Sequence, residues 1–236
     1  MKVAAITDIG LHRKRNEDCY FINEERSFFI VCDGMGGHKG GDVASRLAVQ
    51  TMQKHLSFTT SAEIIPKLRN AVKMVNEAIY TKGRSDESLF EMGTTLTAAV
   101  IRNGNMVVAH VGDSSLFLYK KDGRLKKVTR DHTLAEQMLT DGLLKKEEQP
   151  ANAYNHVLTR AVGVESQVEV DIFQEEIMAG DWIMICTDGL TDLVSENEIY
   201  EKLKSAQEPQ ATAQALLDLA MNKGGYDNIT IVLLSV

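Results

Sequence analysis

Strand-like and helix-like segments follow one another in blocks along this chain, and this order restricts the fold more than any other feature of the sequence. Regular alternation of strands and helices would indicate a parallel sheet, whereas blocks favour antiparallel sheets with helices outside them. Apolar runs rich in β-branched and aromatic residues predict strands at 3–8, 19–23, 27–32, 95–101, 105–111, 115–120, 168–173, 182–187 and 229–235. We therefore expect an α+β fold.

Helical spacing of apolar residues separates the third predicted strand from the fourth and returns near the end of the chain. The stretches are 44–56, 64–79 and 211–219, with shorter helices expected near 133–141 and 196–204. Asn103-Gly104 and Asp122-Gly123 each divide two strand-like runs, and these dipeptides tolerate the positive φ of tight primed turns. The flanking strands are therefore expected to form hairpins.

The whole chain, 1–236, is expected to form one domain. Its 236 residues exceed the usual domain size, but sandwich and barrel domains reach this length. The sequence contains only three prolines and shows no repeat or Ser/Gly-rich tract, so no linker is visible. The least patterned stretch, 142–157, is interpreted as a surface excursion or flap.

The charge balance argues against a nucleic-acid partner. The chain carries 33 acidic and 26 basic residues, a net charge of −7, without a basic block. No apolar run is long enough to span a membrane, and the amino terminus reaches Asp8 too soon for a signal peptide. Cys19, Cys32 and Cys186 form no CxxC pair and no even set, which fits a reducing compartment. We expect a cytoplasmic protein with no membrane partner.

Five aspartates share one setting, because each stands at an end of a predicted strand or beside a turn. They are Asp18, Asp33, Asp113, Asp188 and Asp227. Strand ends point to a rim where loops gather, so these acids can converge although they are far apart in sequence. Each alone could be an ordinary turn residue. Five together favour a common site.

Convergence of carboxylates requires a cation. Two carboxylates about 4 Å apart repel each other by roughly 4 kcal/mol at an effective dielectric constant near 20. All candidate ligands are hard oxygens and no His/Cys set has zinc spacing, so magnesium or manganese fits better than zinc. Two such ions about 3.5–4 Å apart lower the pKa of a shared water molecule and clamp a phosphoryl group. The acids therefore predict metal-dependent hydrolysis.

Other kinds of phosphate chemistry fit the sequence less well. The glycine-rich stretch 34–41 precedes a predicted helix, as a nucleotide-binding loop would. However, Lys39 stands at the third glycine position, no Gly-Lys-Ser/Thr follows, and Asp33 would repel a phosphate. A cysteine phosphatase needs an arginine at a fixed spacing after its cysteine, and the residues found there are Glu25, His38 and Asp192. A Gly-x-Ser-x-Gly elbow is also absent.

Six motifs spread over nearly the whole chain resemble the type 2C metal-dependent protein Ser/Thr phosphatase family (PPM), especially its compact bacterial members. They are Asp8-x-Gly10-x-x-Arg13-x-x-Asn16-Glu17-Asp18, Asp33-Gly34-Met35-Gly36-Gly37, Gly93-Thr94-Thr95, Gly112-Asp113-Ser114, Thr187-Asp188-Gly189-Leu190 and Asp227-Asn228-Ile229-Thr230. The resemblance implies a four-layer α-β-β-α sandwich, with two antiparallel sheets flanked by helix pairs. It also implies hydrolysis of phosphoserine and phosphothreonine on proteins by a metal-bridging water.

The resemblance implies a metal-binding role for each matching acid. Asp33 would bridge two Mn²⁺ or Mg²⁺ ions, and the Gly34 carbonyl would bind one of them. Asp188 and Asp227 would bind the other ion. Asp18 would be a direct or water-mediated ligand.

Two residues of the first motif are expected to act on water and substrate. By resemblance, Glu17 would orient metal-bound water and Arg13 would hold the substrate phosphate, a task that suits a bidentate guanidinium. Arg13 could also belong to a solvated basic turn with Lys14 and Arg15.

A third, weakly bound ion is common in similar enzymes, and Asp113, Asp188 and Asp192 match its ligands. Asp192 could equally cap a helix before Leu193. The family's flap corresponds to 136–157 here and is expected to influence substrate choice.

Met35 departs from family members in which a histidine follows Asp-Gly and is proposed to protonate the leaving group. A metal-bound water could act instead, and His38 is expected to be a loop or helix-start residue. The expected partners are phosphorylated proteins and a cognate Ser/Thr kinase, and the chain is expected to be a monomer.

Two alternative functions stay open: a regulator phosphatase of the same superfamily acting on an anti-sigma antagonist, or a metal-binding pseudophosphatase module. Arg13 and the complete ligand set argue against both.

Overall fold

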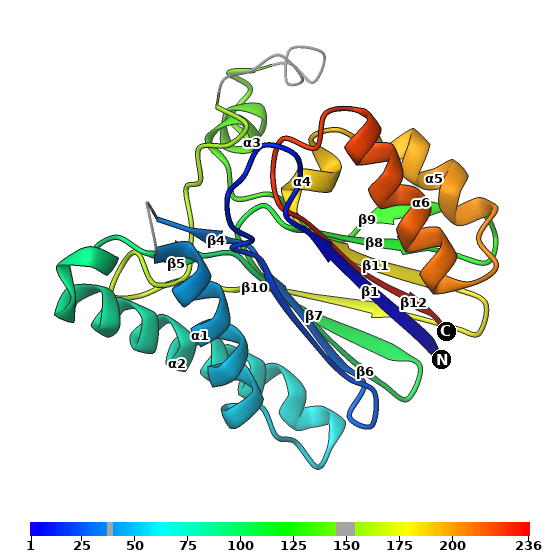
Figure 1. Ribbon diagram of the computed structural model, residues 1–236. Coiled ribbons are helices and arrows are strands. Elements are labelled where there is room, and N and C mark those ends of the chain that lie inside the picture. The colour runs from blue at the N-terminus through cyan, green and yellow to red at the C-terminus, as the bar shows by residue number, and fades with distance from the viewer. Residues whose placement is uncertain (37–39, 145–153) are drawn as a thin grey trace.

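Two antiparallel sheets packed face to face form the centre of the computed structural model, which describes residues 1–36, 40–144 and 154–236 (Figure 1). The first sheet has the order β1-β12-β11-β8-β9 and comprises β1 Lys2–Asp8, β12 Ile229–Ser235, β11 Trp182–Cys186, β8 Ser115–Tyr119 and β9 Leu125–Lys127. The second has the order β10-β7-β6-β3-β2 and comprises β10 Asp171–Glu176, β7 Asn105–Val111, β6 Leu96–Arg102, β3 Phe28–Cys32 and β2 Cys19–Asn23. A separate short ladder joins β4 Gly34–Met35 to β5 Gly93–Thr94.

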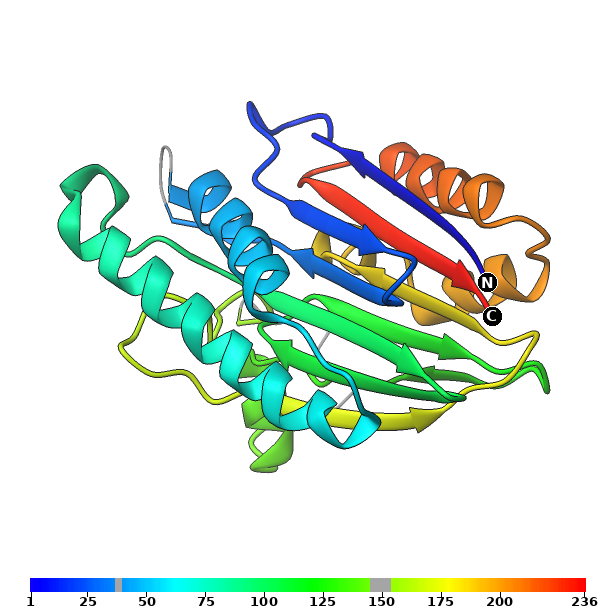
Figure 2. The same ribbon diagram turned by 90° about the horizontal axis from the view of Figure 1, so that it is seen from below.

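Helices cover the outer face of each sheet, which confirms the predicted four-layer α-β-β-α sandwich. The helices α1 (Gly40–His55) and α2 (Ile64–Ser85) pack on the second sheet, whereas α5 (Glu196–Lys204) and α6 (Pro209–Asn222) pack on the first. Figure 2 shows the two pairs on opposite sides of the strands. The shorter helices are η2 Ser61–Glu63, η3 Glu87–Leu89, α3 Leu134–Thr140 and α4 Asp188–Thr191. None of the described helices is long and apolar enough to cross a membrane.

Strand β3 illustrates how the layers share one chain. Phe29 and Val31 point into the core between the sheets, whereas Phe28, Ile30 and Cys32 point towards α1 and α2. Successive side chains of a strand point to opposite faces, so all five are buried. The continuous apolar runs in the sequence therefore reflect strands that are covered on both faces.

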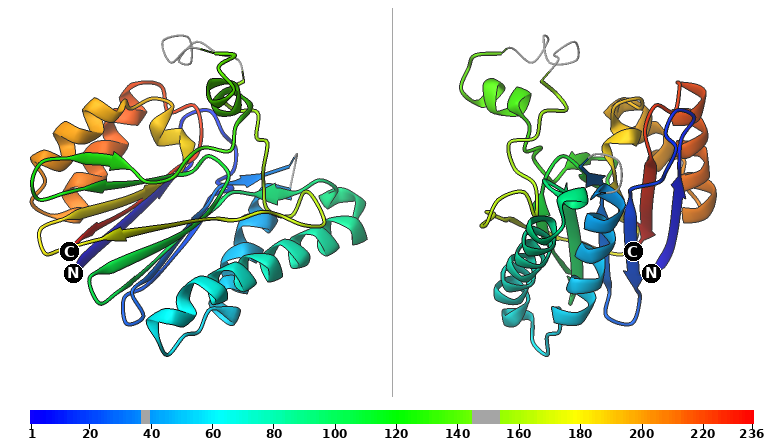
Figure 3. Two further views of the ribbon diagram at one scale, coloured as in Figure 1. Left: turned by 180° about the vertical axis from the view of Figure 1, so that it is seen from behind. Right: turned by 60° about the vertical axis from the view of Figure 1, so that its left-hand side comes forward.

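The two chain ends lie side by side, as Figure 3 shows, because β1 pairs with β12 along its whole length. This pairing has a consequence at the other end of the two strands. Asp8, the last residue of β1, lies opposite Ile229, the first residue of β12. The loop that follows β1 and the loop that precedes β12 therefore leave the sheet together.

Short elements and one turn differ from the sequence predictions. Asn103 and Gly104 both have positive φ, 52° and 73°, which confirms a primed turn between β6 and β7. The hairpin predicted at Asp122-Gly123 is confirmed, because β8 pairs antiparallel with β9, but its turn is not a primed one, since only Gly123 has a positive φ, 89°. The strand expected at 168–173 begins instead at Asp171. The elements β4, β5, β9 and α4 were not predicted, because they are too short for a periodic pattern.

Truncation of a side chain between the sheets should destabilise the protein strongly. Leu118 is completely buried there, so Leu118→Ala should lower the free energy of unfolding by about 2–5 kcal/mol through the cavity that it leaves. Denaturant unfolding measures this change. Met178→Ala, at a side chain that is 59% exposed, is the control and should cost less than about 0.5 kcal/mol. Equal losses in both variants would contradict a close-packed core between the sheets.

Candidate metal centre

A cleft of about 670 Å³ opens at one end of the sandwich, where strands of both sheets begin or end. Asp33 follows β3, Asp113 follows β7, Asp188 follows β11 and Asp227 precedes β12. Antiparallel neighbours reverse direction at the same edge, so these positions meet despite their separation in sequence. The predicted site residues that line the cleft are Arg13, Glu17, Asp33, Gly34, Asp113, Asp188, Asp192 and Asp227.

Asp18 does not line the cleft but is adjacent to it. Its Oδ2 accepts hydrogen bonds from the hydroxyl groups of Thr230 at 2.7 Å and Thr187 at 3.0 Å. Burial raises the pKa of Asp18 to about 7 despite these bonds, and the charges of Asp188 and Asp227 add to the rise. All the sequence-predicted acids therefore belong to one electrostatically connected group.

Asp33 is surrounded by other carboxylates. Its pKa is raised well above the usual range, first by burial and then by the charges of Asp18 and Asp188. The carboxyl groups of Asp33 and Asp188 lie within hydrogen-bonding reach of each other. The backbone of Asp33 is fixed, because its N–H donates to the Thr95 hydroxyl at 2.9 Å.

The oxygen atoms of this group are suited to a hard divalent cation. Among the described residues, no hydrogen bond reaches Asp18 Oδ1 or Asp188 Oδ1, although both atoms are buried. A buried acceptor without a partner costs about 1–3 kcal/mol, and neighbouring carboxylates repel one another. A divalent cation would satisfy the oxygen atoms and cancel the repulsion. This chemistry favours a metal site over five independent turn residues.

Gly34 is required by the close approach of two other segments. A Cβ at this position would lie 2.1 Å from the Gly41 carbonyl oxygen and 2.6 Å from that of Glu17. Glycine therefore allows the first turn of α1 and the loop after β1 to reach the segment that follows Asp33. Of the glycine-rich stretch, residues 37–39 with His38 lie outside the described residues.

Arg13 and Glu17 both belong to the loop between β1 and β2. Arg13 Nη2 lies 2.6 Å from Asp227 Oδ2, so the arginine contacts the acidic group and is not merely part of a solvated turn. Burial, followed by the charge of Asp42, raises the pKa of Glu17. A carboxylate with a raised pKa accepts and holds a proton more readily than an ordinary glutamate does.

Asn228 holds this loop in place, a role that was not predicted from the sequence. Its side-chain NH₂ donates to the carbonyl oxygens of Ile9 and Arg15, at 2.9 Å each. Its Oδ1 accepts from the Glu17 N–H at 2.8 Å. Asn228 stands in a recognised motif beside Asp227, but no local pattern indicates which distant backbone an amide will clamp.

Asp113 and Asp192 form a second acidic group beside Asp188. Burial, followed by the charge of Asp188, raises the pKa of Asp192 to about 7. His156 Nδ1 lies 3.4 Å from Asp192 Oδ2, and ligand atoms of His156, Asp188 and Asp192 lie within 4.8 Å of one another. Asp192 directly follows the last residue of α4, and Ser195 caps the start of α5, so the prediction that Asp192 caps a helix beginning at Leu193 is wrong. No sequence pattern indicated a role for His156, because it is a single histidine in an unpatterned stretch.

Known proteins share these sequence and structural features. The sequence profile of the protein phosphatase 2C family matches residues 12–222. The chain is 38% identical to the serine/threonine phosphatase stp of Listeria monocytogenes over 234 residues, which cover 96% of this chain and 92% of that protein. The crystal structure of the Mycobacterium tuberculosis serine/threonine phosphatase PstP/Ppp matches with a TM-score of 0.93 and 33% identity, over 100% of this chain and 98% of that one. The PstP catalytic domain in complex with 2 manganese ions matches with a TM-score of 0.88 and 34% identity, over 98% and 96% of the two chains.

The acidic group should make the metal-free protein less stable as the pH rises. The pKa of Asp18 is 3.8 in its ordinary state and about 7 when folded, so the folded protein binds protons that the unfolded chain has released. Stability is therefore lost between these pH values, by an amount on the order of 4 kcal/mol, since a pKa difference of one is worth about 1.4 kcal/mol. Thermal unfolding in a chelator at about pH 5, inside this window, and at about pH 8, above it, measures most of the loss.

Asp33→Asn removes one of the repelling charges and should raise the melting temperature of the metal-free protein at the higher pH. Asp218→Asn, at an exposed helix position, is the matched control and should leave it unchanged. Burial lowers the pKa of His110 to about 3, and this shift makes the protein more stable as the pH rises. The contribution is the same in the wild type, Asp33→Asn and Asp218→Asn, so it does not affect their comparison. A melting temperature of Asp33→Asn equal to that of the control would show that the carboxylates do not repel one another.

Proposed function

The chain belongs to the protein phosphatase 2C family and is a metal-dependent serine/threonine protein phosphatase, and we propose that Asp33, Asp188, Asp227 and the Gly34 carbonyl hold its metal ions. The observation that carries the proposal is the convergence of buried carboxylates with unsatisfied oxygen atoms in one cleft. Asp18 is included as a direct or water-mediated ligand, because its Oδ1 is one of those atoms.

The ions are proposed to be two Mn²⁺ or Mg²⁺ per chain. An all-oxygen donor set supports these hard cations, and the PstP catalytic domain was crystallised with 2 manganese ions. When bound, such a pair lowers the pKa of a water molecule and neutralises charge on a phosphoryl group. A third, weaker ion would be held by Asp113, Asp188 and Asp192, beside His156.

Two side chains of the β1–β2 loop are proposed to act on the substrate and on water. Arg13 carries the guanidinium at the edge of the acidic group, where it would bind the phosphate through two N–H donors. Glu17, with its raised pKa, would orient water or accept its proton. Met35 also lines the cleft and has no titratable proton, so it cannot protonate the leaving group.

Substrates are phosphorylated proteins, and we propose that a cognate Ser/Thr kinase supplies them. Residues 1–236 would form one catalytic domain that works as a monomer in the cytoplasm, with the flap at 136–157 beside the cleft. The three unpaired cysteines support a reducing compartment. Of the flap, 145–153 lies outside the described residues.

The complete acidic group argues against a pseudophosphatase module, and the presence of Arg13 argues against an anti-sigma regulator phosphatase.

Loss of either carboxylate at the centre of the cleft should abolish turnover. Asp33→Asn and Asp188→Asn keep the side-chain size but remove a charged ligand, so hydrolysis of p-nitrophenyl phosphate should fall to that of the chelator-treated wild type. The wild type should need added Mn²⁺ or Mg²⁺, and the exposed Asp218→Asn should behave like it. Turnover without any divalent metal, or full activity of Asp188→Asn, would refute the ligand assignment.

The hydroxyl group of Thr230 should matter for metal binding although it is not a proposed ligand. It donates to Asp18 Oδ2 at 2.7 Å and so orients the carboxylate. Thr230→Val keeps the shape without the donor and should weaken Mn²⁺ binding about 10–100-fold, as loss of such supporting bonds does elsewhere. Titration calorimetry measures this change, and Thr230→Ser should restore the affinity. Unchanged affinity in Thr230→Val would show that this bond does not orient Asp18 for the metal, since Thr187 donates to the same oxygen.

A further inference from the structure

Three neighbouring side chains form an exposed, largely apolar surface at the rim of the cleft, which we call the rim platform: Leu11, His12 and Tyr226. Leu11 is 62% and Tyr226 is 60% exposed, high values for large apolar side chains. The rings of His12 and Tyr226 contact each other with centroids 5.1 Å apart. The platform therefore joins two loops that are distant in sequence.

Two glycines form the floor beneath the rim platform. A Cβ at Gly224 would lie 2.5 Å from the Tyr226 ring, and a Cβ at Gly225 would lie 3.3 Å from Leu11 Cγ. Both glycines have positive φ, 128° and 49°. The Leu11 N–H donates to the Gly225 carbonyl oxygen at 2.8 Å. The exposed side chains thus rest on a defined backbone surface, which limits their freedom before any ligand arrives.

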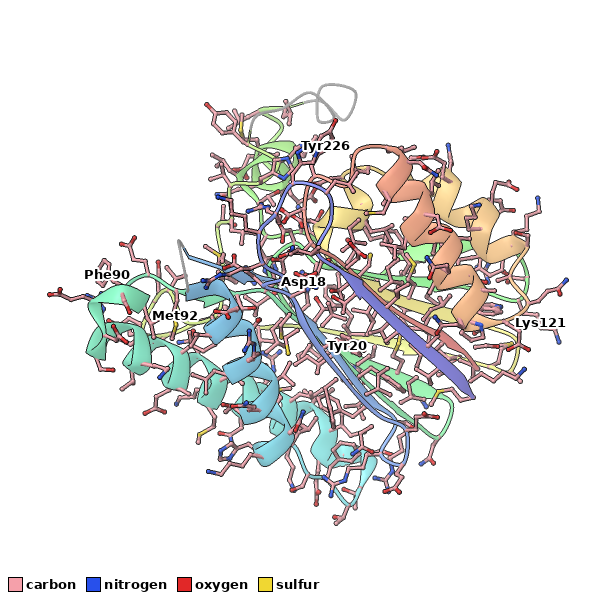
Figure 4. The ribbon with its side chains drawn as sticks, in the orientation of Figure 1. Asp18, Tyr20, Phe90, Met92, Lys121 and Tyr226 are labelled. Carbon is pink, nitrogen blue, oxygen red and sulfur yellow. The ribbon has the colours of Figure 1, made fainter. Side chains whose placement is uncertain are left out.

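The platform is continuous with the site of the chemistry. Tyr226 itself lines the cleft, and Figure 4 shows it above Asp18, at the end of the sandwich where the loops gather. His12 precedes Arg13 and Tyr226 precedes Asp227, and Arg13 and Asp227 are joined by their 2.6 Å ion pair. Consecutive Cα atoms of a peptide are about 3.8 Å apart, so a residue next to a phosphoresidue in the cleft lies within reach of this rim.

We propose that the rim platform is a substrate subsite that binds an apolar or aromatic side chain adjacent to the phosphorylated serine or threonine. This inference rests on the phosphatase function proposed for the cleft. A protein substrate must lay the residues beside its phosphate across this rim, and the rim offers an aliphatic group and stacked rings. An apolar side chain gains by covering them, whereas a polar one of similar size does not. The occupant is therefore an extended segment of the substrate itself.

Two phosphothreonine peptides of equal length and charge test this preference. One carries leucine or phenylalanine on each side of the phosphothreonine, and the other carries serine there. The wild type should hydrolyse the apolar peptide with a kcat/KM about tenfold higher, the size of effect that a modest hydrophobic subsite gives. Hydrolysis of p-nitrophenyl phosphate reports the chemistry alone. Equal kcat/KM for the two peptides, with p-nitrophenyl phosphate still hydrolysed, would overturn the subsite but leave the phosphatase function intact.

Variants locate the preference on the protein. Leu11→Ser and Tyr226→Ala should each reduce the ratio of the two kcat/KM values towards one, and Tyr226→Phe should keep it. Met178→Ser is the matched control, since Met178 is 59% exposed and lies beside Lys121, far from Tyr226 in Figure 4. A ratio that persists in both platform variants would overturn the proposal. So would a concentration-dependent dimer of the wild type that Leu11→Ser abolishes while the peptides stay equal, because the platform would then bind a second copy.

Discussion

Mutual repulsion among buried carboxylates is the constraint on which the rest of this structure depends. Asp18, Asp33, Asp113 and Asp188 all have raised pKa values, with burial as the first cause in each. Side chains under such repulsion would turn towards solvent unless neighbouring groups held them. For Asp18 the holding groups are the hydroxyls of Thr187 and Thr230, which fix its carboxylate without adding charge. Thr187 follows β11 and Thr230 lies near the start of the adjacent strand β12, so the sheet that brings the acids together also restrains Asp18.

The sandwich supplies the stiffness that this restraint needs. Strands such as β3 and β11 are buried on both faces. One face of each strand packs in the core between the sheets, and the opposite face packs beneath the helices. Close-packed interiors resist small displacements, so a strand end cannot move without disturbing two cores. A metal site built from strand ends therefore inherits a geometry that loops alone would not maintain.

The sequence predicted the layers and the acidic residues, because both follow from repeated local patterns. Alternation and helical spacing located the long elements, and strand ends located Asp18, Asp33, Asp113, Asp188 and Asp227. What it could not predict depends on contacts between distant segments. The Asn228 amide binds backbone more than two hundred residues earlier in the chain, at Ile9 and Arg15, with separations of 219 and 213 residues. Gly34 is fixed by the approach of Gly41 and Glu17, which no spacing rule describes.

The same two loops carry Arg13, which is proposed to bind the phosphate, the two proposed metal ligands Asp18 and Asp227, and the rim platform. They leave adjacent strands together, since Asp8 lies opposite Ile229, and are joined by the Asn228 amide and by the bond between Leu11 and Gly225. A peptide side chain on the platform therefore contacts the same backbone that orients Arg13 and Asp227. Binding of a substrate side chain at this rim would therefore affect the positions of Arg13 and Asp227 through the shared loops and not through the flap. A substrate whose side chain fits the platform would reduce the motion of the loops that hold its phosphate, so that specificity and catalytic positioning arise from one set of contacts.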